Sequence, residues 1–146
     1  FGGYNWLIFV FAFLPGIWEE IAFRGVILNL QLQKYNKYTV VFLNGILFGL
    51  YHFVNMLLGQ EFFPTLFQIF YASFMGFSFA YMYIKTKSLL PSIILHYLLD
   101  SVGLLFQTVV FKNGVYEGLF IIFGISIIPA ILMILLTSLI TKRNNF

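Results

Sequence analysis

Long apolar stretches separated by short polar loops dominate this sequence. Five such segments run approximately over Tyr4–Leu32, Tyr38–Leu58, Pro64–Ile84, Leu89–Phe111 and Glu117–Ile140. A helix rises ~1.5 Å per residue, so each segment is long enough to cross the ~30 Å hydrocarbon core of a bilayer. The pattern therefore predicts an all-α fold, a polytopic transmembrane helix bundle with about five membrane segments.

Small and helix-breaking residues add local expectations to this bundle. Pro15 and Gly16 predict a kink or break within the first segment, because proline lacks the backbone N–H of a helical residue. Gly45 and Gly49 in the second segment, and a row of small residues in the third, predict close helix packing, although small residues are common in membrane helices generally. That row is Ala72, Gly76 and Ala80. The last segment carries few polar side chains, which favours a peripheral, lipid-facing position.

Composition and charge agree with a membrane protein. The chain is 61% hydrophobic and 9% charged, and its mean hydropathy is +0.95. The net charge of +3 does not indicate nucleic-acid binding, because the basic residues lie in short loops rather than in one patch. Lys34, Lys37, Lys85, Lys87, Lys142 and Arg143 fall on one side, opposite Lys112, Glu61 and Glu117. The positive-inside rule then places the Lys34, Lys85 and Lys142 ends in the cytoplasm, with membrane lipid around the bundle.

A single domain, residues 1–146, is expected from the length. The chain begins at Phe1 within apolar sequence, so further N-terminal helices are expected to be missing. Cysteine is absent, which excludes disulfides, thiolate metal sites and a cysteine nucleophile.

Ionisable side chains inside the predicted helices are few, and they mark a candidate site. They are Glu19, Glu20, Arg24, His52, His96 and Asp100. Charges are costly in hydrocarbon, so such residues are functional candidates by default. Counted from the predicted cytoplasmic ends at ~1.5 Å per residue, Glu19, His52 and Asp100 lie ~22, ~21 and ~17 Å deep. The three helices are therefore expected to be neighbours around one site.

The two glutamates differ in their spacing from Arg24. Glu20 and Arg24 are four residues apart, the spacing at which an acid and a base pair on a helix. We therefore interpret Glu20 and Arg24 as a structural ion pair and leave Glu19 free for chemistry. Phe48 is expected to form a wall of the site. The polar residues Asn44, Asn55 and Gln68 are interpreted as helix-packing groups.

Two chemistries suit these residues. A carboxylate and an imidazole can take a proton from water, and a second imidazole can stabilise the oxyanion that follows. Alternatively Glu19, His52 and His96 form a two-histidine, one-carboxylate set of the kind that binds catalytic zinc. The cofactor is thus left open between zinc and none. An aspartyl dyad is excluded because Asp100 is the chain's single aspartate.

Three short motifs resemble those of a known family. They are EExxxR at Glu19–Arg24, FxxxH at Phe48–His52 and HxxxD at His96–Asp100. In this order they resemble the CPBP family, the CAAX-protease and bacteriocin-processing (Abi) intramembrane proteases, over roughly residues 15–103. The resemblance implies that Glu19 and His52 activate water and that His96 and Asp100 stabilise the oxyanion. Metal-dependent and metal-free glutamate mechanisms compete for this family. Its last motif position is often Asn, which donates a hydrogen bond, whereas Asp100 donates only when protonated.

The leading hypothesis is therefore an intramembrane endopeptidase that cleaves a membrane-associated peptide or lipidated protein. The resemblance implies either removal of the tripeptide of prenylated CAAX proteins, as in eukaryotic members, or bacteriocin and pheromone processing in a bacterial cell membrane. The alternative is a non-catalytic bacteriocin self-immunity protein or membrane scaffold. A proton-coupled transporter is a third hypothesis, disfavoured because no inverted repeat is evident.

Overall fold

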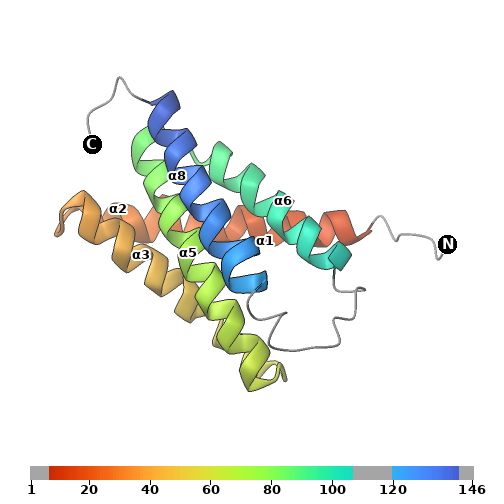
Figure 1. Cartoon of the computed structure of the whole chain (residues 1–146). Helices are drawn as coiled ribbons and strands as arrows, with labels where there is room; N and C mark the ends of the chain where they lie inside the picture. The colour runs from red at the N-terminus through yellow and green to blue at the C-terminus, as the bar shows by residue number, and fades with distance from the viewer. Residues whose placement is uncertain (1–6, 107–119, 142–146) are drawn as a thin grey trace.

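A computed structural model describes residues 7–106 and 120–141, and its regular elements there are all helical (Figure 1). The elements are α1 (Leu7–Glu20), η1 (Ile21–Ile27), α2 (Leu28–Leu32), α3 (Lys37–Tyr51), α4 (Val54–Leu57), α5 (Phe62–Thr86), α6 (Leu90–Phe106), η2 (Phe120–Ile127) and α8 (Ile128–Ile140), where η denotes a π-helix. These two ranges contain no strand, which confirms the all-α prediction.

The five predicted segments correspond to five helical segments. The first comprises α1, η1 and α2, the second α3 and α4, the third α5, the fourth α6 and the fifth η2 with α8. The loop residues Lys112, Glu117, Lys142 and Arg143 lie outside the described residues. The cytoplasmic assignment of Lys34 and Lys85 therefore stays a prediction.

The first segment is not broken at Pro15. α1 continues through Pro15 and Gly16 to Glu20, and the chain leaves α-helical geometry only at Ile21. Gly16 has a packing role instead, because a Cβ there would lie 3.3 Å from the backbone nitrogen of Tyr97 on α6. The absence of a side chain at Gly16 thus allows α1 and α6 to approach closely.

The outer faces of the helices suit a lipid environment. Two helical stretches are long and apolar enough to cross a membrane, Lys37–Leu57 and Phe62–Thr86, and Leu90–Gly103 and Ile128–Ile140 are shorter apolar helices. Large apolar side chains such as Phe42, Leu58 and Leu136 are more than half exposed. Large exposed apolar surfaces are rare on soluble monomers, and in a membrane the acyl chains of lipids would cover them.

Helix α5 is the central element of the bundle. It contacts α3, α4, α6, α8, η1 and η2, while α1 packs along α6. Figure 1 shows α5 crossing the first helical segment. Its buried Met75, Phe79 and Met82 form a cluster with Ala130 and Met133 of α8. The opposite face of α8 is exposed, which agrees with the predicted lipid-facing position of the last segment.

The predicted small-residue contact joins α3 to α5. A Cβ on Gly76 would lie 2.8 Å from Gly45 Cα, and a Cβ on Gly49 would lie 2.6 Å from the carbonyl oxygen of Ile69. Ala72 and Ala80 are buried in the same region. Only glycine fits at these crossing points, which brings the two backbones together as in small-xxx-small packing.

Replacing Gly45 by alanine tests this contact. The new Cβ would lie 2.8 Å from the Phe77 backbone nitrogen, so the helices must separate, and we expect a loss of about 1–3 kcal/mol in unfolding free energy. The measurement is denaturant unfolding in detergent micelles. Gly103→Ala is the matched control, because a Cβ at Gly103 meets nothing within 4 Å. Equal stability of the two variants would contradict the packing.

Candidate active site

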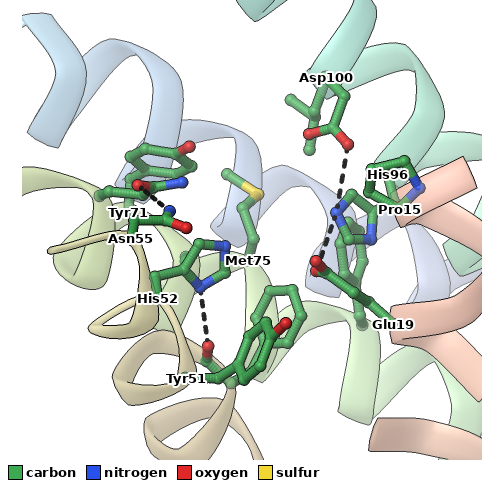
Figure 2. A pocket seen from close by; sticks show the side chains of 14 residues that line it. Pro15, Glu19, Tyr51, His52, Asn55, Tyr71, Met75, His96 and Asp100 are labelled. Atoms are coloured by element: carbon green, nitrogen blue, oxygen red, sulfur yellow. Dashed lines mark hydrogen bonds and ion pairs between the residues drawn. The ribbon is translucent and has the colours of Figure 1, made fainter. Parts of the chain in front are cut away.

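A cavity of about 230 Å³ contains all four side chains predicted to be catalytic. Glu19 comes from α1, His52 directly follows α3, and His96 and Asp100 come from α6. Figure 2 shows His52 on one side of this cavity and Glu19, His96 and Asp100 on the other. Residues far apart in the sequence therefore line one cavity, while their depth in a membrane stays a prediction.

His96 is the centre of the acidic side of the cavity. Its Nδ1 lies 3.1 Å from Glu20 Oε1, while its Nε2 lies 3.7 Å from Glu19 Oε2 and 3.6 Å from Asp100 Oδ2. The first distance is a hydrogen bond, whereas the other two are ion-pair distances. With Nδ1–H donating to Glu20, Nε2 is held towards Glu19 and Asp100.

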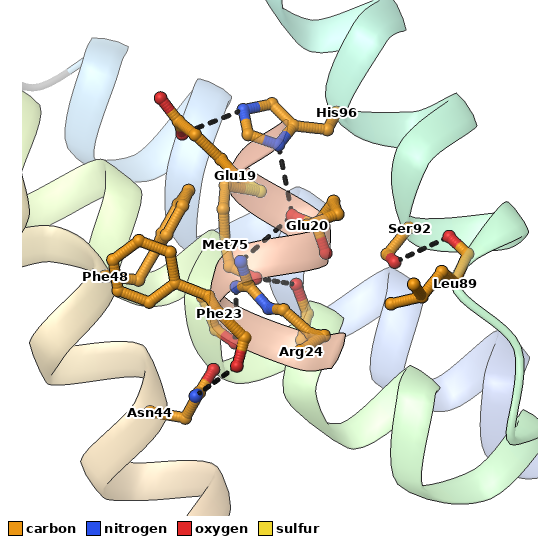
Figure 3. A network of polar contacts seen from close by, with 12 residues as sticks. Glu19, Glu20, Phe23, Arg24, Asn44, Phe48, Met75, Leu89, Ser92 and His96 are labelled. Carbon is orange, nitrogen blue, oxygen red and sulfur yellow. Dashed lines mark hydrogen bonds and ion pairs between the residues drawn. The ribbon is translucent and has the colours of Figure 1, made fainter. Parts of the chain in front are cut away.

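Glu20 and Arg24 form the ion pair that their spacing predicts. Arg24 Nη1 donates to Glu20 Oε1 over 2.9 Å, and both side chains are completely buried (Figure 3). Arg24 Nη2 donates to the carbonyl oxygen of Gly76 on α5, 3.2 Å away. The guanidinium also lies 4.3 Å from the ring centroid of Phe48 and 5.3 Å from that of Phe79. Cation–π contacts of this kind stabilise a charge without water.

The π-helix η1 begins immediately after Glu20 and contains Arg24. At its end the backbone N–H of Leu28 donates to the carbonyl of Phe23, five residues back, so the carbonyl of Arg24 loses its usual α-helical donor. The side chain of Asn29 donates to that carbonyl over 3.1 Å and to the Gly25 carbonyl over 2.7 Å. Asn44 of α3 donates to the Phe23 carbonyl over 2.9 Å. Two amide side chains thus support the wide turn that carries Arg24, and Asn44 has the packing role expected of it.

His52 lies where the second segment is interrupted. α3 ends at Tyr51, residues 52 and 53 form a turn, and α4 starts at Val54. His52 Nδ1 lies 3.0 Å from the Phe48 carbonyl oxygen, so the tautomer that satisfies this carbonyl carries its proton on Nδ1. The lone pair of Nε2 then remains available to a ligand in the cavity.

A family model described as type II CAAX prenyl endopeptidase, Rce1-like, matches residues 2–102. This range covers more than half of the chain and contains every predicted site residue. The chain belongs to this Rce1-like family. No curated protein and no solved structure matches the chain.

Membership of the Rce1-like family confirms the family that the three motifs predicted. The family is one of membrane-embedded CAAX-type proteases that act on peptide or protein substrates. Protease activity and a membrane location therefore hold at the level of the family.

The contacts in this Rce1-like chain differ from the pairs that the motifs suggested. The imidazole nearest to Glu19 is that of His96, whereas His52 is bonded to the backbone of Phe48. Glu20 contacts both Arg24 and His96 through the same oxygen. Glu20 is therefore more than a partner for Arg24, because it also sets the orientation of His96.

A zinc ion needs three or more converging ligands. Among residues 7–106 and 120–141, no group of three or more His, Cys, Asp or Glu side chains is arranged to hold a metal ion. Glu19 and His96 lie on one side of the cavity and His52 on the other (Figure 2). The zinc set of Glu19, His52 and His96 does not fit a metal as these side chains stand, and it stays a prediction.

Four further polar residues that the sequence did not assign to the site line the cavity. They are Tyr51, Asn55, Gln68 and Tyr71. Asn55 and Gln68 were interpreted as packing groups; they do bond to each other, with Asn55 Nδ2 donating to Gln68 Oε1 over 2.8 Å, but they also face the cavity. A helical stripe on α5 could have signalled this wall, since Gln68, Tyr71, Met75 and Phe79 recur at three- and four-residue intervals.

Breaking the Glu20–Arg24 ion pair tests how much this pair contributes to the free energy of unfolding. Arg24→Met leaves a buried carboxylate without its counter-charge, and we expect a loss of about 3–5 kcal/mol in unfolding free energy. The double variant Glu20→Gln with Arg24→Met is the control, and it should lose less than Arg24→Met alone. Denaturant unfolding of the two single variants and the double variant in detergent measures the coupling. Strictly additive losses would show that the two side chains act independently.

Proposed function

We propose that this protein is an intramembrane endopeptidase that hydrolyses a peptide bond of a membrane-associated substrate with water activated by Glu19 and His52. The observation that supports this most is the single cavity, which holds Glu19, His52, His96 and Asp100 from three separate helical segments. CAAX protease-type activity of the family agrees with it.

Water activation follows from the two acceptors that face the cavity. The Glu19 carboxylate can accept one proton of a bound water, and His52 Nε2 can accept a hydrogen bond from the other, because its Nδ1 is engaged with Phe48. Held between the two acceptors, the water presents its oxygen lone pair to the substrate carbonyl. General-base catalysis by one positioned side chain contributes about 10²–10⁴-fold.

His96 acts by holding Glu19 in position. Its Nδ1 is anchored to Glu20, which is itself anchored to Arg24, so Nε2 is fixed near the Glu19 carboxylate. A protonated His96 offsets the charges of Glu19 and Asp100 on either side of it. Positioned groups of this kind avoid reorganisation during the reaction.

The reaction balances with these groups alone. The water oxygen bonds to the carbonyl carbon, Glu19 takes the water proton, and the carbonyl electron pair moves to oxygen. On collapse the carbon–nitrogen bond breaks, and the leaving nitrogen takes the proton from Glu19. The products are a carboxylic acid and an amine.

The size of the cavity limits how much of the substrate it can hold. A water occupies about 30 Å³, so a cavity of about 230 Å³ accommodates a water, the scissile peptide bond and a few neighbouring atoms. A lipid chain on the substrate must then remain in the bilayer, against the exposed apolar faces of the helices. We infer that the substrate is a peptide segment, prenylated as the family description indicates.

Replacement of Glu19 tests the catalytic role. Glu19→Gln keeps the shape of the side chain but removes the base, and we expect kcat to fall by about 10²–10⁴-fold. His52→Gln should lower kcat in the same direction. The measurement is cleavage of a quenched fluorogenic peptide with a farnesylated CAAX end, by protein in proteoliposomes.

Glu61→Gln is the matched control, because Glu61 is exposed at the start of α5 and should tolerate the change. Cleavage by Glu19→Gln at the wild-type rate would overturn the proposal. A non-catalytic immunity protein would show no cleavage by any variant and would protect cells equally well with Gln at position 19.

Chelation tests the metal dependence. We expect 1,10-phenanthroline to leave the cleavage rate within about twofold, because Glu19 and His52 can activate water as paired acceptors without a Lewis acid. Metal analysis of the same preparation is the accompanying measurement. Loss of activity on chelation, restored by added Zn²⁺, would instead support Glu19, His52 and His96 as zinc ligands.

A further inference from the structure

The cavity must supply hydrogen bonds to the backbone of any peptide that enters it. A peptide inside an apolar bundle loses its bonds to water, and each backbone N–H or C=O group left without a partner there is costly. The ionised carboxylates of Glu19 and Asp100 accept hydrogen bonds but donate none, whereas a side-chain amide offers an N–H group and a C=O group together. The side chain that best matches a peptide backbone is therefore an amide.

Two side-chain amides line the cavity, Asn55 of α4 and Gln68 of α5, and both residues are partly exposed. Asn55 Nδ2 donates to Gln68 Oε1 over 2.8 Å, which uses one N–H of Asn55 and one lone pair of Gln68. The C=O group and the second N–H of Asn55 remain, together with an N–H of Gln68. These atoms are not among the buried polar atoms that lack a partner in residues 7–106 and 120–141. They are therefore accessible to a ligand in the cavity.

A second amide pair, Asn44 and Gln31, shows what a pair with a packing role looks like. Its members are also thirteen residues apart, and Asn44 Nδ2 donates to Gln31 Oε1 over 3.3 Å. Asn44 is completely buried and does not line the cavity. Packing of one helix against another thus needs no opening onto the cavity, and the Asn55–Gln68 pair has one.

The backbone around Asn55 fixes the pair relative to His52. The Asn55 N–H donates to the His52 carbonyl over 3.0 Å, and the Asn55 carbonyl accepts from the Gln60 N–H over 2.9 Å. A step of three residues with bonds of this 3₁₀ type rises ~6 Å, whereas an extended peptide advances ~3.3 Å per residue. Figure 2 shows Asn55 and His52 on the same side of the cavity, opposite Glu19 and Asp100. The amide pair therefore lies about two peptide residues from His52.

We propose that Asn55 and Gln68 form a subsite that binds the backbone of the substrate within about two residues of the scissile bond. The proposal rests on the endopeptidase function proposed above. Asn55 Oδ1 accepts a hydrogen bond from a substrate N–H, and an N–H of the pair donates to a substrate C=O. These bonds are the same before and during the reaction, so they raise affinity without raising kcat. The subsite recognises the backbone and not the side chain, and proline, which has no N–H, is disfavoured at that one position.

Substitutions in the pair test the subsite, with the farnesylated quenched peptide as substrate for protein in proteoliposomes. Gln68→Met and Asn55→Leu keep the approximate size of each side chain but remove its hydrogen-bonding groups. We expect each to raise KM by about 3–10-fold, the effect of one lost hydrogen bond, with kcat within about twofold of the wild type. Gln31→Met is the matched control, because it removes the same amide from the pair outside the cavity and should leave KM unchanged. Thermal unfolding verifies that each variant is folded.

Substrates with an altered backbone separate direct binding from a structural role of Asn55. In a series of peptides, one amide N–H at a time is replaced by an ester oxygen, at each position other than the scissile bond. At the position that Asn55 binds, the ester should raise the KM of the wild type by about 3–10-fold but should have no further effect on Asn55→Leu. A purely structural role would leave every ester effect the same in the wild type and in the variant.

The outcomes distinguish this proposal from the one on which it rests. Unchanged KM in both Asn55→Leu and Gln68→Met, or equal ester effects in the wild type and Asn55→Leu, would overturn the subsite while Glu19→Gln remains inactive. A fall in kcat at unchanged KM would reassign the pair to positioning His52 and would overturn the subsite as well. Full cleavage by Glu19→Gln, or none by the wild type, would overturn the endopeptidase function. Fluorescence anisotropy of the bound peptide then tests the subsite alone, and a Kd raised in Gln68→Met but not in Gln31→Met would support it.

Discussion

The arrangement of the site depends on the cost of burying the Arg24 guanidinium in an apolar bundle. A buried charge is stable only when it is paired and its donors are satisfied. Arg24 is paired with Glu20 on its own helical segment and contacts the Gly76 carbonyl on α5 and the ring of Phe48 on α3, while its Nε has no hydrogen-bond partner among the described residues. Because Glu20 Oε1 also accepts a hydrogen bond from His96, α6 is joined to the same network of buried polar contacts. One buried cation therefore ties together four of the five helical segments.

The π-helix between Glu20 and Leu28 resolves a conflict of register within the first segment. Glu19 and Glu20 must face α6 and the cavity, whereas Leu28 is completely buried in a cluster with Val40, Ala80 and Ile84. A π-helix has a wider turn than an α-helix, so it rotates the residues after it relative to those before it. The backbone carbonyls that this turn exposes are bonded by Asn29 and Asn44. Functional sites are frequent locations for such turns.

Much of the fold and part of the site follow from the sequence because hydropathy and helical spacing act within one segment. They define each segment and the pairing of Glu20 with Arg24, and they led to the expectation that Glu19, His52 and Asp100 belong to one site, whose four predicted side chains line one cavity. Contacts between segments depend on how the helices are rotated against one another, which no single segment determines. One such contact is the hydrogen bond that His96 donates to Glu20. The rotation of α5 likewise decides that Gln68 and Tyr71 line the cavity. The π-helix was also missed, since its support by Asn29 becomes visible only when the backbone bonds are known.

The two walls of the cavity carry different polar groups. One wall carries the carboxylates of Glu19 and Asp100 with His96 between them, and the other carries the amides of Asn55 and Gln68 and the hydroxyl of Tyr71. If the carboxylates shared a wall with the amides and the hydroxyl, these groups would form hydrogen bonds with one another and would be less available to a ligand. Their separation by a cavity of about 230 Å³ leaves both sets of polar groups facing the same space. α5 carries Gln68 and Tyr71 and packs against α3, while α1 and α6 carry the two carboxylates and pack against each other. The tight contact at Gly45 and Gly76 therefore also determines where Gln68 and Tyr71 lie relative to Glu19.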